Sequence, residues 1–272
     1  MELYNDDCLE KMKDIKDESI DLLFCDLPYG QTSCKWDCEI DLELFWKEVN
    51  RICKKTTPMI FTCSVKFGNS LINSNPKNFR YDLVWVKSSP CGFLNAKKMP
   101  MKKHEMVYVF YKKLPKVYTD SVAEHHTHKF IKSTDKKEIG GLYGTGVERM
   151  DGQKGQYNPP LPTSVLKTEH ETAYGNNTHH HCTQQRNGES IYDPPLPNSI
   201  LEIKSEKGKH ATQKPVELIK WCLKYYSKEG DIILDPTMGS GSTGLACKQM
   251  NRKFIGIEKD KEIYDVACKR LE

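Results

Sequence analysis

Short apolar runs alternate with amphipathic stretches along this chain of 272 residues. The run from Ile20 to Cys25 is almost continuously apolar, which is typical of a strand buried on both faces of a parallel sheet. Residues 41–54 then place their apolar side chains on one face at helical spacing, and Pro58–Cys63 returns to a strand pattern. This alternation predicts an α/β fold built on a doubly wound, mainly parallel sheet.

The same alternation returns toward the C-terminus. The pattern predicts helices after Pro215 and again up to Leu271. Further predicted strands are short and rich in β-branched and aromatic residues, at 3–4, 81–86, 106–111, 231–234 and 254–257.

Residues 112–209 differ from the rest of the chain. They are polar, rich in His, Gly, Pro, Asn and Thr, and show no sustained period. Their one internal repeat, 157–166 against 192–201, has too few copies for a solenoid. We therefore expect one domain formed by residues 1–111 and 210–272, interrupted by a loop-rich insertion at 112–209.

The composition narrows the class of protein. A net charge of +4 permits nucleic acid as a partner without requiring it. No apolar run approaches transmembrane length and the first residues do not resemble a signal peptide, so we expect a cytoplasmic protein without a membrane partner. The eleven cysteines are scattered, which favours reduced thiols. The histidine clusters at 125–128 and 179–181 lack metal-ligand spacing, so no metal is expected.

The strand at 20–25 ends in Asp26-Leu27-Pro28-Tyr29-Gly30. Open α/β sheets bind ligands beyond the C-terminal ends of their strands, and a carboxylate beside an aromatic ring suits a planar molecule that carries an amine, such as a nucleobase. Asp and Pro are also ordinary turn formers, so a plain strand-ending turn is the alternative.

A glycine loop, Asp235-Pro236-Thr237-Met238-Gly239-Ser240-Gly241-Ser242-Thr243-Gly244, follows a predicted strand and precedes a helix. Such a loop lets a nucleotide-like ligand approach backbone amides, and Glu258, about twenty residues on, can accept hydrogen bonds from ribose hydroxyls. Asp235 would repel a pyrophosphate. It suits a cation instead, such as the α-ammonium of S-adenosylmethionine (SAM). The alternative is a tight turn without a ligand.

Together these motifs resemble the amino-methyltransferases of DNA, in the class whose catalytic motif precedes the SAM loop. Residues 26–29 resemble the Asp-Pro-Pro-Tyr catalytic motif, with Leu27 in place of the first proline, and 235–241 resemble the SAM loop. His210-Ala211-Thr212-Gln213-Lys214-Pro215 is similar to the family's His-Pro-Thr-Gln-Lys-Pro signature. Segments 85–87, 92–98 and 104–105 are similar to those that flank the target pocket, so the likeness covers the chain outside the insertion.

The resemblance implies a Rossmann-like methyltransferase fold in a circularly permuted order. The chain stops after a helix, so the next strand of the doubly wound sheet would be Leu3-Tyr4 at the other end of the sequence.

The resemblance also implies roles for single residues. The Asp26 carboxylate and the Leu27 carbonyl would accept the two N–H bonds of the target amine, Pro28 would stiffen the turn, and Tyr29 would stack on a flipped base. Asp7 could equally be a helix cap, and Lys214 a solvated charge. The implied cofactor-binding set is Asp7, Cys8, Thr212, Gln213, Lys214, Asp235, Pro236, Thr237, Gly239, Gly241, Ser242, Thr243 and Glu258.

DNA is the implied macromolecular partner. Between residues 97 and 137 the sequence has eleven lysines and four acidic residues, and contact with DNA phosphates is one explanation of this positive charge. The insertion at 112–209 is the candidate target-recognition region. A homodimer is a further possibility that the sequence does not decide. The candidate DNA-binding residues are Lys87, Asn95, Lys97, Lys98, Lys102 and Lys103.

The sequence therefore predicts a SAM-dependent DNA methyltransferase of the restriction-modification type, acting on the N6 amine of adenine after base flipping. Cytosine-N4 methylation is the closest alternative, because it uses the same geometry, although serine is commoner than aspartate at the first motif position in that branch. A catalytically silent, DNA-binding subunit is the alternative from another class.

Overall fold

The computed structural model describes residues 1–29, 40–92, 98, 100–116, 118, 185–186, 189–190, 200–205 and 213–272. The chain divides into two compact units. The first contains Met1–Ser88, Glu105–Val122 and Asn198–Glu272, and the second contains Ser89–His104 and Ala123–Pro197.

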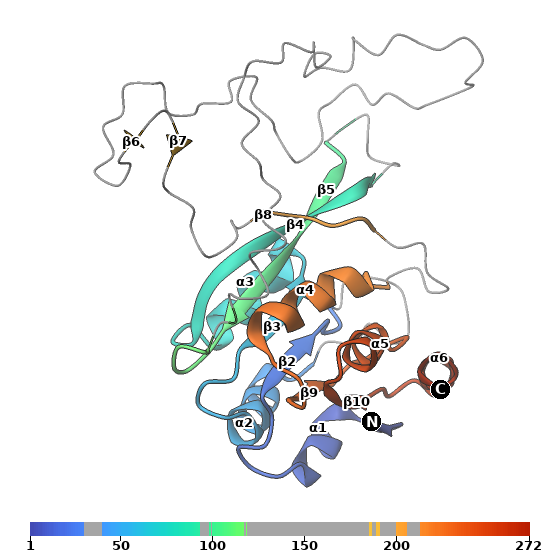
Figure 1. Cartoon of the computed structure of the whole chain (residues 1–272). Coiled ribbons are helices and arrows are strands. Elements are labelled where there is room, and N and C mark those ends of the chain that lie inside the picture. Colours follow the sequence, from blue (N-terminus) through green and yellow to red (C-terminus); the bar gives the residue numbers. More distant parts are fainter. Residues whose placement is uncertain are drawn as a thin grey trace, which may run out of the picture. The chain divides into compact units, whose positions relative to one another are not determined.

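The first unit is built on an eight-stranded sheet with the order β1-β10-β9-β2-β3-β5-β4-β8 (Figure 1). The five strands from β1 to β3 are parallel, β5 runs antiparallel to β3, and β8 is parallel to β4. The sheet is therefore mainly parallel, as predicted. The strands are β1 (Glu2–Tyr4), β2 (Leu22–Cys25), β3 (Met59–Cys63), β4 (Phe79–Cys91), β5 (Lys102–Phe110), β8 (Ile200–Glu202), β9 (Ile232–Asp235) and β10 (Lys253–Ile257).

Helices cover both faces of this sheet. Successive side chains of a strand point to opposite faces. Accordingly, Leu22 and Phe24 pack in one core with α4, α5 and α6, whereas Leu23 and Cys25 pack in a second core with α1, α2 and α3. The helices are α1 (Cys8–Lys11), followed by a 3-10 turn at Met12–Asp14, then α2 (Leu42–Ile52), α3 (Val65–Ser74), α4 (Val216–Tyr226), α5 (Ser242–Gln249) and α6 (Lys261–Leu271).

The two ends of the chain meet in the sheet. β1 pairs in parallel with β10, with Leu3 opposite Gly256 and Tyr4 opposite Ile257. The first strand of the sequence thus continues the sheet where the last strand leaves it. This pairing confirms the predicted permuted order.

Two features of the first unit were not predicted. β8 lies inside the polar segment 112–209, yet it forms an edge of the main sheet beside β4. α3 was missed because its sequence is rich in Asn, Ser and Gly, which are poor helix formers. The helix forms because the Ser64 hydroxyl caps its first turn and Phe67, Gly68 and Leu71 are buried on one face.

In the second unit the structure describes a two-stranded antiparallel ladder, β6 (Gln185–Arg186) with β7 (Glu189–Ser190). The eight cysteines among the described residues are free thiols, and six of them are buried. Among all the residues that the structure describes, no helix has the length and apolar character needed to cross a membrane.

Candidate active site

The two predicted motifs follow neighbouring strands. β9 and β2 are adjacent and parallel, so Asp235 at the end of β9 and Asp26 directly after β2 lie at the same edge of the sheet. From β9 the chain proceeds to β10 on one side, whereas from β2 it proceeds to β3 on the other side. The pair β9/β2 is therefore the topological switch point, which is where open α/β sheets bind ligands.

Three side chains bond the carboxylate of Asp26. Its Oδ1 accepts from the Thr62 hydroxyl at 2.7 Å and lies 2.6 Å from the Tyr29 hydroxyl, and its Oδ2 accepts from Lys214 Nζ at 2.5 Å. Two hydroxyl oxygens therefore lie within hydrogen-bond distance of Oδ1. Oδ2 has one donor among the described residues, so it is the oxygen that can accept a further hydrogen bond from a ligand.

Lys214 lies between two carboxylates. Its side chain is 11% exposed, and its Nζ is 2.5 Å from Asp26 and 3.8 Å from Glu105 Oε2. Glu105 Oε1 is in turn 2.8 Å from Nζ of Lys87. Burial by itself would lower the pKa of the Lys214 ammonium, but the two carboxylates outweigh burial and raise that pKa. Lys214 is therefore a buried cation in a set of two lysines and two carboxylates, whose charges sum to zero.

Tyr29 is held at both ends of its side chain. Its ring packs against Phe67 of α3 with centroids 5.2 Å apart, and its hydroxyl oxygen is also 2.9 Å from the Thr62 carbonyl. Burial, followed by the negative charge of Asp26, raises the pKa of Tyr29 well above its usual value. The phenol is thus neutral and donates its proton toward Asp26 or Thr62.

Leu27 occupies the position at which the family pattern has proline. Its side chain is 2% exposed and packs in the core that faces α1, α2 and α3. Burial of this leucine anchors the turn between Asp26 and Tyr29 by packing instead of by a proline ring.

Thr237 connects the glycine loop to the catalytic turn. Its hydroxyl donates to the main-chain carbonyl of Asp26 at 3.1 Å, and the Cys25 thiol lies 3.4 Å from the same hydroxyl. The two motifs are 211 residues apart in sequence. A direct hydrogen bond thus fixes their separation at the switch point.

The glycine loop is folded around Asp235. Oδ1 of this side chain accepts from the Thr237 amide at 3.2 Å and Oδ2 from the Thr243 hydroxyl at 2.5 Å. Burial raises the pKa of Asp235 to about 7, although both hydrogen bonds favour the ionised form. Gly239 and Gly241 have positive φ angles of 50° and 79°. The loop therefore needs glycine at these two points.

Glu258 directly follows β10, the neighbour of β9, and Asp7 follows β1, the next strand beyond β10. The Glu258 carboxylate accepts from the amides of Gly239, at 3.0 Å, and Asp260, at 2.9 Å. Burial raises its pKa. Asp7 caps α1 through the amide of Leu9 and pairs with Lys259, Nζ to Oδ2, at 2.9 Å. Asp7 thus has the predicted helix-cap role, and the structure places it beside Lys259, the residue after Glu258.

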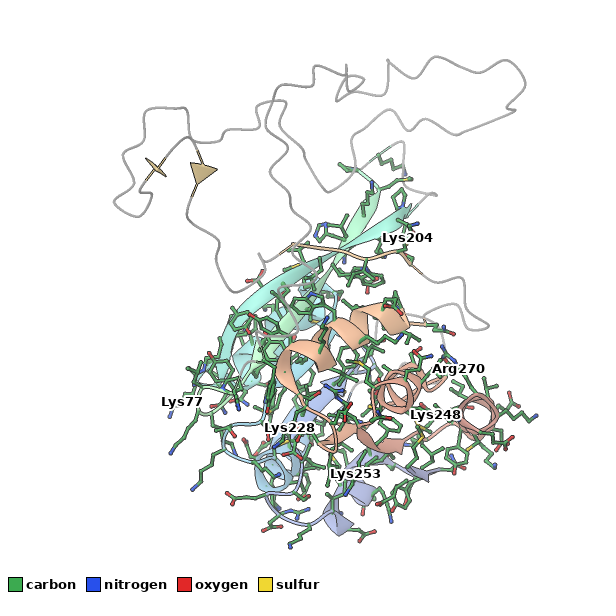
Figure 2. All side chains as sticks on the ribbon, in the orientation of Figure 1. Lys77, Lys204, Lys228, Lys248, Lys253 and Arg270 are labelled. Atoms are coloured by element: carbon green, nitrogen blue, oxygen red, sulfur yellow. The ribbon has the colours of Figure 1, made fainter. Side chains whose placement is uncertain are left out.

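Arg270 of α6 holds the middle of the glycine loop (Figure 2). Its Nη1 lies 3.1 Å from the Ser240 carbonyl and 3.0 Å from the Ser242 hydroxyl. The Ser240 hydroxyl also faces the side chain of Gln213 at 3.5 Å. The last helix of the chain and the segment before α4 therefore both contact this loop.

A model of the DNA methylase family, N6/N4 methyltransferases, matches residues 20–269. The chain belongs to this family. Its members methylate exocyclic amino groups, as the resemblance implied.

Curated relatives include the type II methyltransferase M.HinfI of Haemophilus influenzae, which is 27% identical over 97% of the chain and 66% of the relative. The type II methyltransferase M2.DpnII of Streptococcus pneumoniae is 48% identical over 26% of each protein. The chain therefore spans slightly less than two thirds of M.HinfI, and a much smaller share of M2.DpnII is matched.

Two solved structures share the fold. The M1.HpyAVI complex with SAM superposes with a TM-score of 0.56, at 24% identity over 99% of both chains. The PvuII cytosine-N4-specific DNA methyltransferase superposes with a TM-score of 0.63, at 15% identity over 99% of this chain and 86% of that one. These matches confirm the predicted Rossmann-like α/β fold of the methylase.

The structure brings most of the predicted cofactor residues to one edge of the sheet. Asp7, Gln213, Asp235, Thr237 and Glu258 follow or end adjacent strands or contact the glycine loop. Cys8 is buried in α1. Thr212, together with Asn95 and Lys97 of the DNA-binding set, lies outside the described residues.

The predicted DNA-binding lysines separate into two groups. Lys87 is only 9% exposed and is paired with Glu105, so the structure places it in the buried charge set around Lys214. Lys98, Lys102 and Lys103 belong to the second unit, where Lys98 is exposed and the other two lie on the first residues of β5.

Two residues around the site, Thr62 and Arg270, were not predicted, and Glu105 was predicted only as part of the segment 104–105 that resembles a flank of the target pocket. Thr62 is the one hydroxyl in the apolar run 59–63, next to the strand that carries Asp26, and that anomaly was the available signal. Arg270 gave no signal of its own, and the ion pairs of Glu105 could not be predicted, because both residues act on partners far away in sequence.

Proposed function

We propose that this protein is a SAM-dependent methyltransferase that modifies the exocyclic N6 amine of adenine in DNA. The hydrogen bond between Thr237 and the Asp26 carbonyl carries the proposal, because it joins a nucleotide-type glycine loop to a turn that presents a carboxylate. A methyl donor on the loop and an amine on the turn would then be adjacent.

The residues at this edge fit SAM. Among the described residues, and apart from its neighbours in the chain, nothing lies within 4 Å of the position that a Cβ would occupy on Gly239, so the loop has open space there. Asp235 and Glu258 provide carboxylates for the ammonium and the ribose hydroxyls, and Gln213 contacts the same loop. The SAM complex of the M1.HpyAVI structure, which shares the fold, supports this cofactor.

When bound, SAM supplies an electrophilic methyl group, which leaves its bonding pair on sulfur and bonds to the lone pair of the amine nitrogen. Asp26 Oδ2 accepts one N–H of the amine and the Leu27 carbonyl accepts the other. These acceptors keep the lone pair directed at the methyl carbon and stabilise the positive charge that develops on nitrogen. The surplus proton of the methylated amine then passes to the Asp26 carboxylate.

Tyr29 stacks on the flipped adenine in this proposal, with Phe67 supporting its ring and its hydroxyl tied to Asp26 and Thr62. Lys98, Lys102 and Lys103 contact phosphates, which predicts binding that weakens steeply with salt. Residues 112–209 read the target sequence. The type II names of the relatives support a restriction-modification setting in the cytoplasm.

Adenine is proposed over cytosine because the motif begins with Asp26. The test is transfer of tritiated methyl groups from SAM to DNA by wild type and Asp26→Asn, with SAM binding measured by calorimetry on both. We expect wild type to bind SAM and label DNA, and Asp26→Asn to bind SAM but lose at least 100-fold in rate.

Asp265→Asn is the matched control, because Asp265 is exposed on α6 and pairs there with Lys261. It should label DNA like wild type. A wild-type protein that binds no SAM would favour the catalytically silent subunit, and an Asp26→Asn variant with full activity would refute the role of Asp26.

A further inference from the structure

Four charged side chains form a row behind the proposed target site, in the order Asp26, Lys214, Glu105, Lys87. The distances between successive charged atoms are 2.5, 3.8 and 2.8 Å. The residues come from the end of β2, the segment before α4, β5 and β4, so the fold brings together parts of the chain that are remote in sequence. Lys214 has a carboxylate on each of two sides, Asp26 and Glu105.

We propose that Lys214 is a positioning residue, which holds the Asp26 carboxylate in place in the free protein and moves toward Glu105 when the target amine binds. This inference rests on the proposed function and assigns Lys214 a role within that mechanism. It concerns the four charged residues, Asp26, Lys214, Glu105 and Lys87, and not the choice between adenine and cytosine.

The first step of the argument is the crowding at Oδ2. Because the hydroxyls of Thr62 and Tyr29 both lie against Oδ1, Oδ2 is the less crowded oxygen and the one that we expect to accept the amine, and it already bonds Lys214. The amine nitrogen becomes positively charged as it gains the methyl group. Two cationic donors on one oxygen repel each other, so the ammonium of Lys214 opposes transfer for as long as it remains there.

The second step is that Glu105 offers Lys214 another place. The ammonium is already 3.8 Å from Oε2 of Glu105, and Lys87 is bonded to the other oxygen. A shift of about an ångström would exchange one carboxylate for the other without leaving a buried cation unpaired, which would be costly. Asp26 would then serve the cationic amine alone.

Other titratable groups also lie near Asp26 and Lys214, and the pH dependence has to be interpreted with them in mind. Burial raises the pKa of the Cys25 thiol well above its usual value, as it does for the Tyr29 phenol, so neither group changes charge at neutral pH. The remaining groups are Cys63 on β3, Lys87 on β4, Glu105 on β5 and Asp235 on β9.

The test compares the pH dependence of single-turnover methylation for wild type, Lys214→Met, Lys214→Arg and Glu105→Gln. A nearby cation favours the ionised form of a carboxylate, so removing that cation in Lys214→Met should move the acidic limb of the rate to higher pH. Lys214→Arg should restore the limb. Glu105→Gln should lower the single-turnover rate about tenfold or more with SAM and DNA dissociation constants within about twofold of wild type, because Lys214 then stays on Asp26.

Lys220→Met is the matched control, because Lys220 pairs with Glu217 on the surface of α4 and should leave the profile unchanged. An acidic limb that Lys214→Met does not move, or a uniform loss of rate at every pH, would overturn the proposal. So would a Glu105→Gln variant with the wild-type rate.

A stability cycle separates this inference from the function itself. Unfolding by urea of Lys214→Met, Asp26→Asn and the double variant needs no methylation. We expect Lys214→Met to unfold at lower urea than the double variant, since the single change leaves a carboxylate without its cation. If the two substitutions changed the free energy of unfolding additively, the ion pair between Lys214 and Asp26 would be overturned. If their effects were coupled but the protein never labelled DNA, only the proposed function would be refuted.

Discussion

The hydroxyl of Thr237 donates a hydrogen bond to the main-chain carbonyl of Asp26 across the boundary between β9 and β2. We expect Thr237→Val to lower the methylation rate about tenfold or more, because reacting groups that are misplaced by an ångström lose much of their rate. Thr237→Ser keeps the hydroxyl and should retain most of the activity. Single-turnover rates at saturating SAM provide the measurement, and equal rates for the valine and serine variants would contradict the bridging role.

The buried Asp235 makes stability depend on pH. Its pKa is raised to about 7 in the folded protein, above the ordinary value of 3.8 for an unfolded aspartate. Between these values the folded state binds the extra proton, so this residue makes stability fall as pH rises, by up to about 1.4 kcal/mol per pH unit.

Asp235→Asn keeps the shape of the side chain but cannot ionise. Relative to this variant, wild type should therefore become less stable between pH 5 and pH 8, as measured by urea unfolding at each pH. Asp265→Asn, at an exposed position, serves as the control. A constant difference in the free energy of unfolding between wild type and Asp235→Asn across this range would show that Asp235 titrates outside pH 5 to 8.

Arg270 should affect cofactor binding from the last turn of α6. Its contacts with the Ser240 carbonyl and the Ser242 hydroxyl fix the glycine loop. Loss of one or two such hydrogen bonds, each worth about 1 kcal/mol, predicts an increase of about three- to thirtyfold in the SAM dissociation constant of Arg270→Ala. Calorimetry on this variant and on Lys269→Ala, at the exposed neighbouring position, tests the idea; equal affinities would refute it.

Gly68 allows α3 to lie against β5. A Cβ at this position would lie 2.0 Å from the Tyr108 ring, so the helix cannot stay where it is with alanine. We expect Gly68→Ala to destabilise the protein by about 1–3 kcal/mol in urea unfolding, as for other overpacked sites. Because Phe67 supports Tyr29, the variant should also bind DNA more weakly. Asn69→Ala, one residue along on the exposed side, should unfold like wild type.

Local sequence patterns predicted the elements of the sheet better than they predicted the site. The apolar runs around Leu22 and Ile233 identify buried strands because a strand covered on both faces has few places for polar side chains. The position of β1 beside β10 followed from the permuted motif order. α3 could not be predicted in this way, because its capping serine and three buried residues act only in the context of the folded sheet.

The site shows the same limit. Asp26 and the glycine loop are readable because each is a compact motif after a strand. The pairing of Lys214 with Asp26 joins residues 188 positions apart, and the ion pair of Glu105 with Lys87 depends on β5 running next to β4. Lys214 was predicted to bind the cofactor or to be a solvated charge, and neither description anticipates a buried ion pair.

The most direct test of the central claim is the identity of the modified nucleoside. Random-sequence DNA would be incubated with the protein and SAM that carries a deuterated methyl group, digested to nucleosides, and analysed by mass spectrometry. The account predicts deuterated N6-methyldeoxyadenosine with wild type and none with Asp26→Asn. Labelled N4-methyldeoxycytidine in its place would contradict the assignment to adenine, and no labelled nucleoside from a protein that binds SAM would contradict the proposed activity.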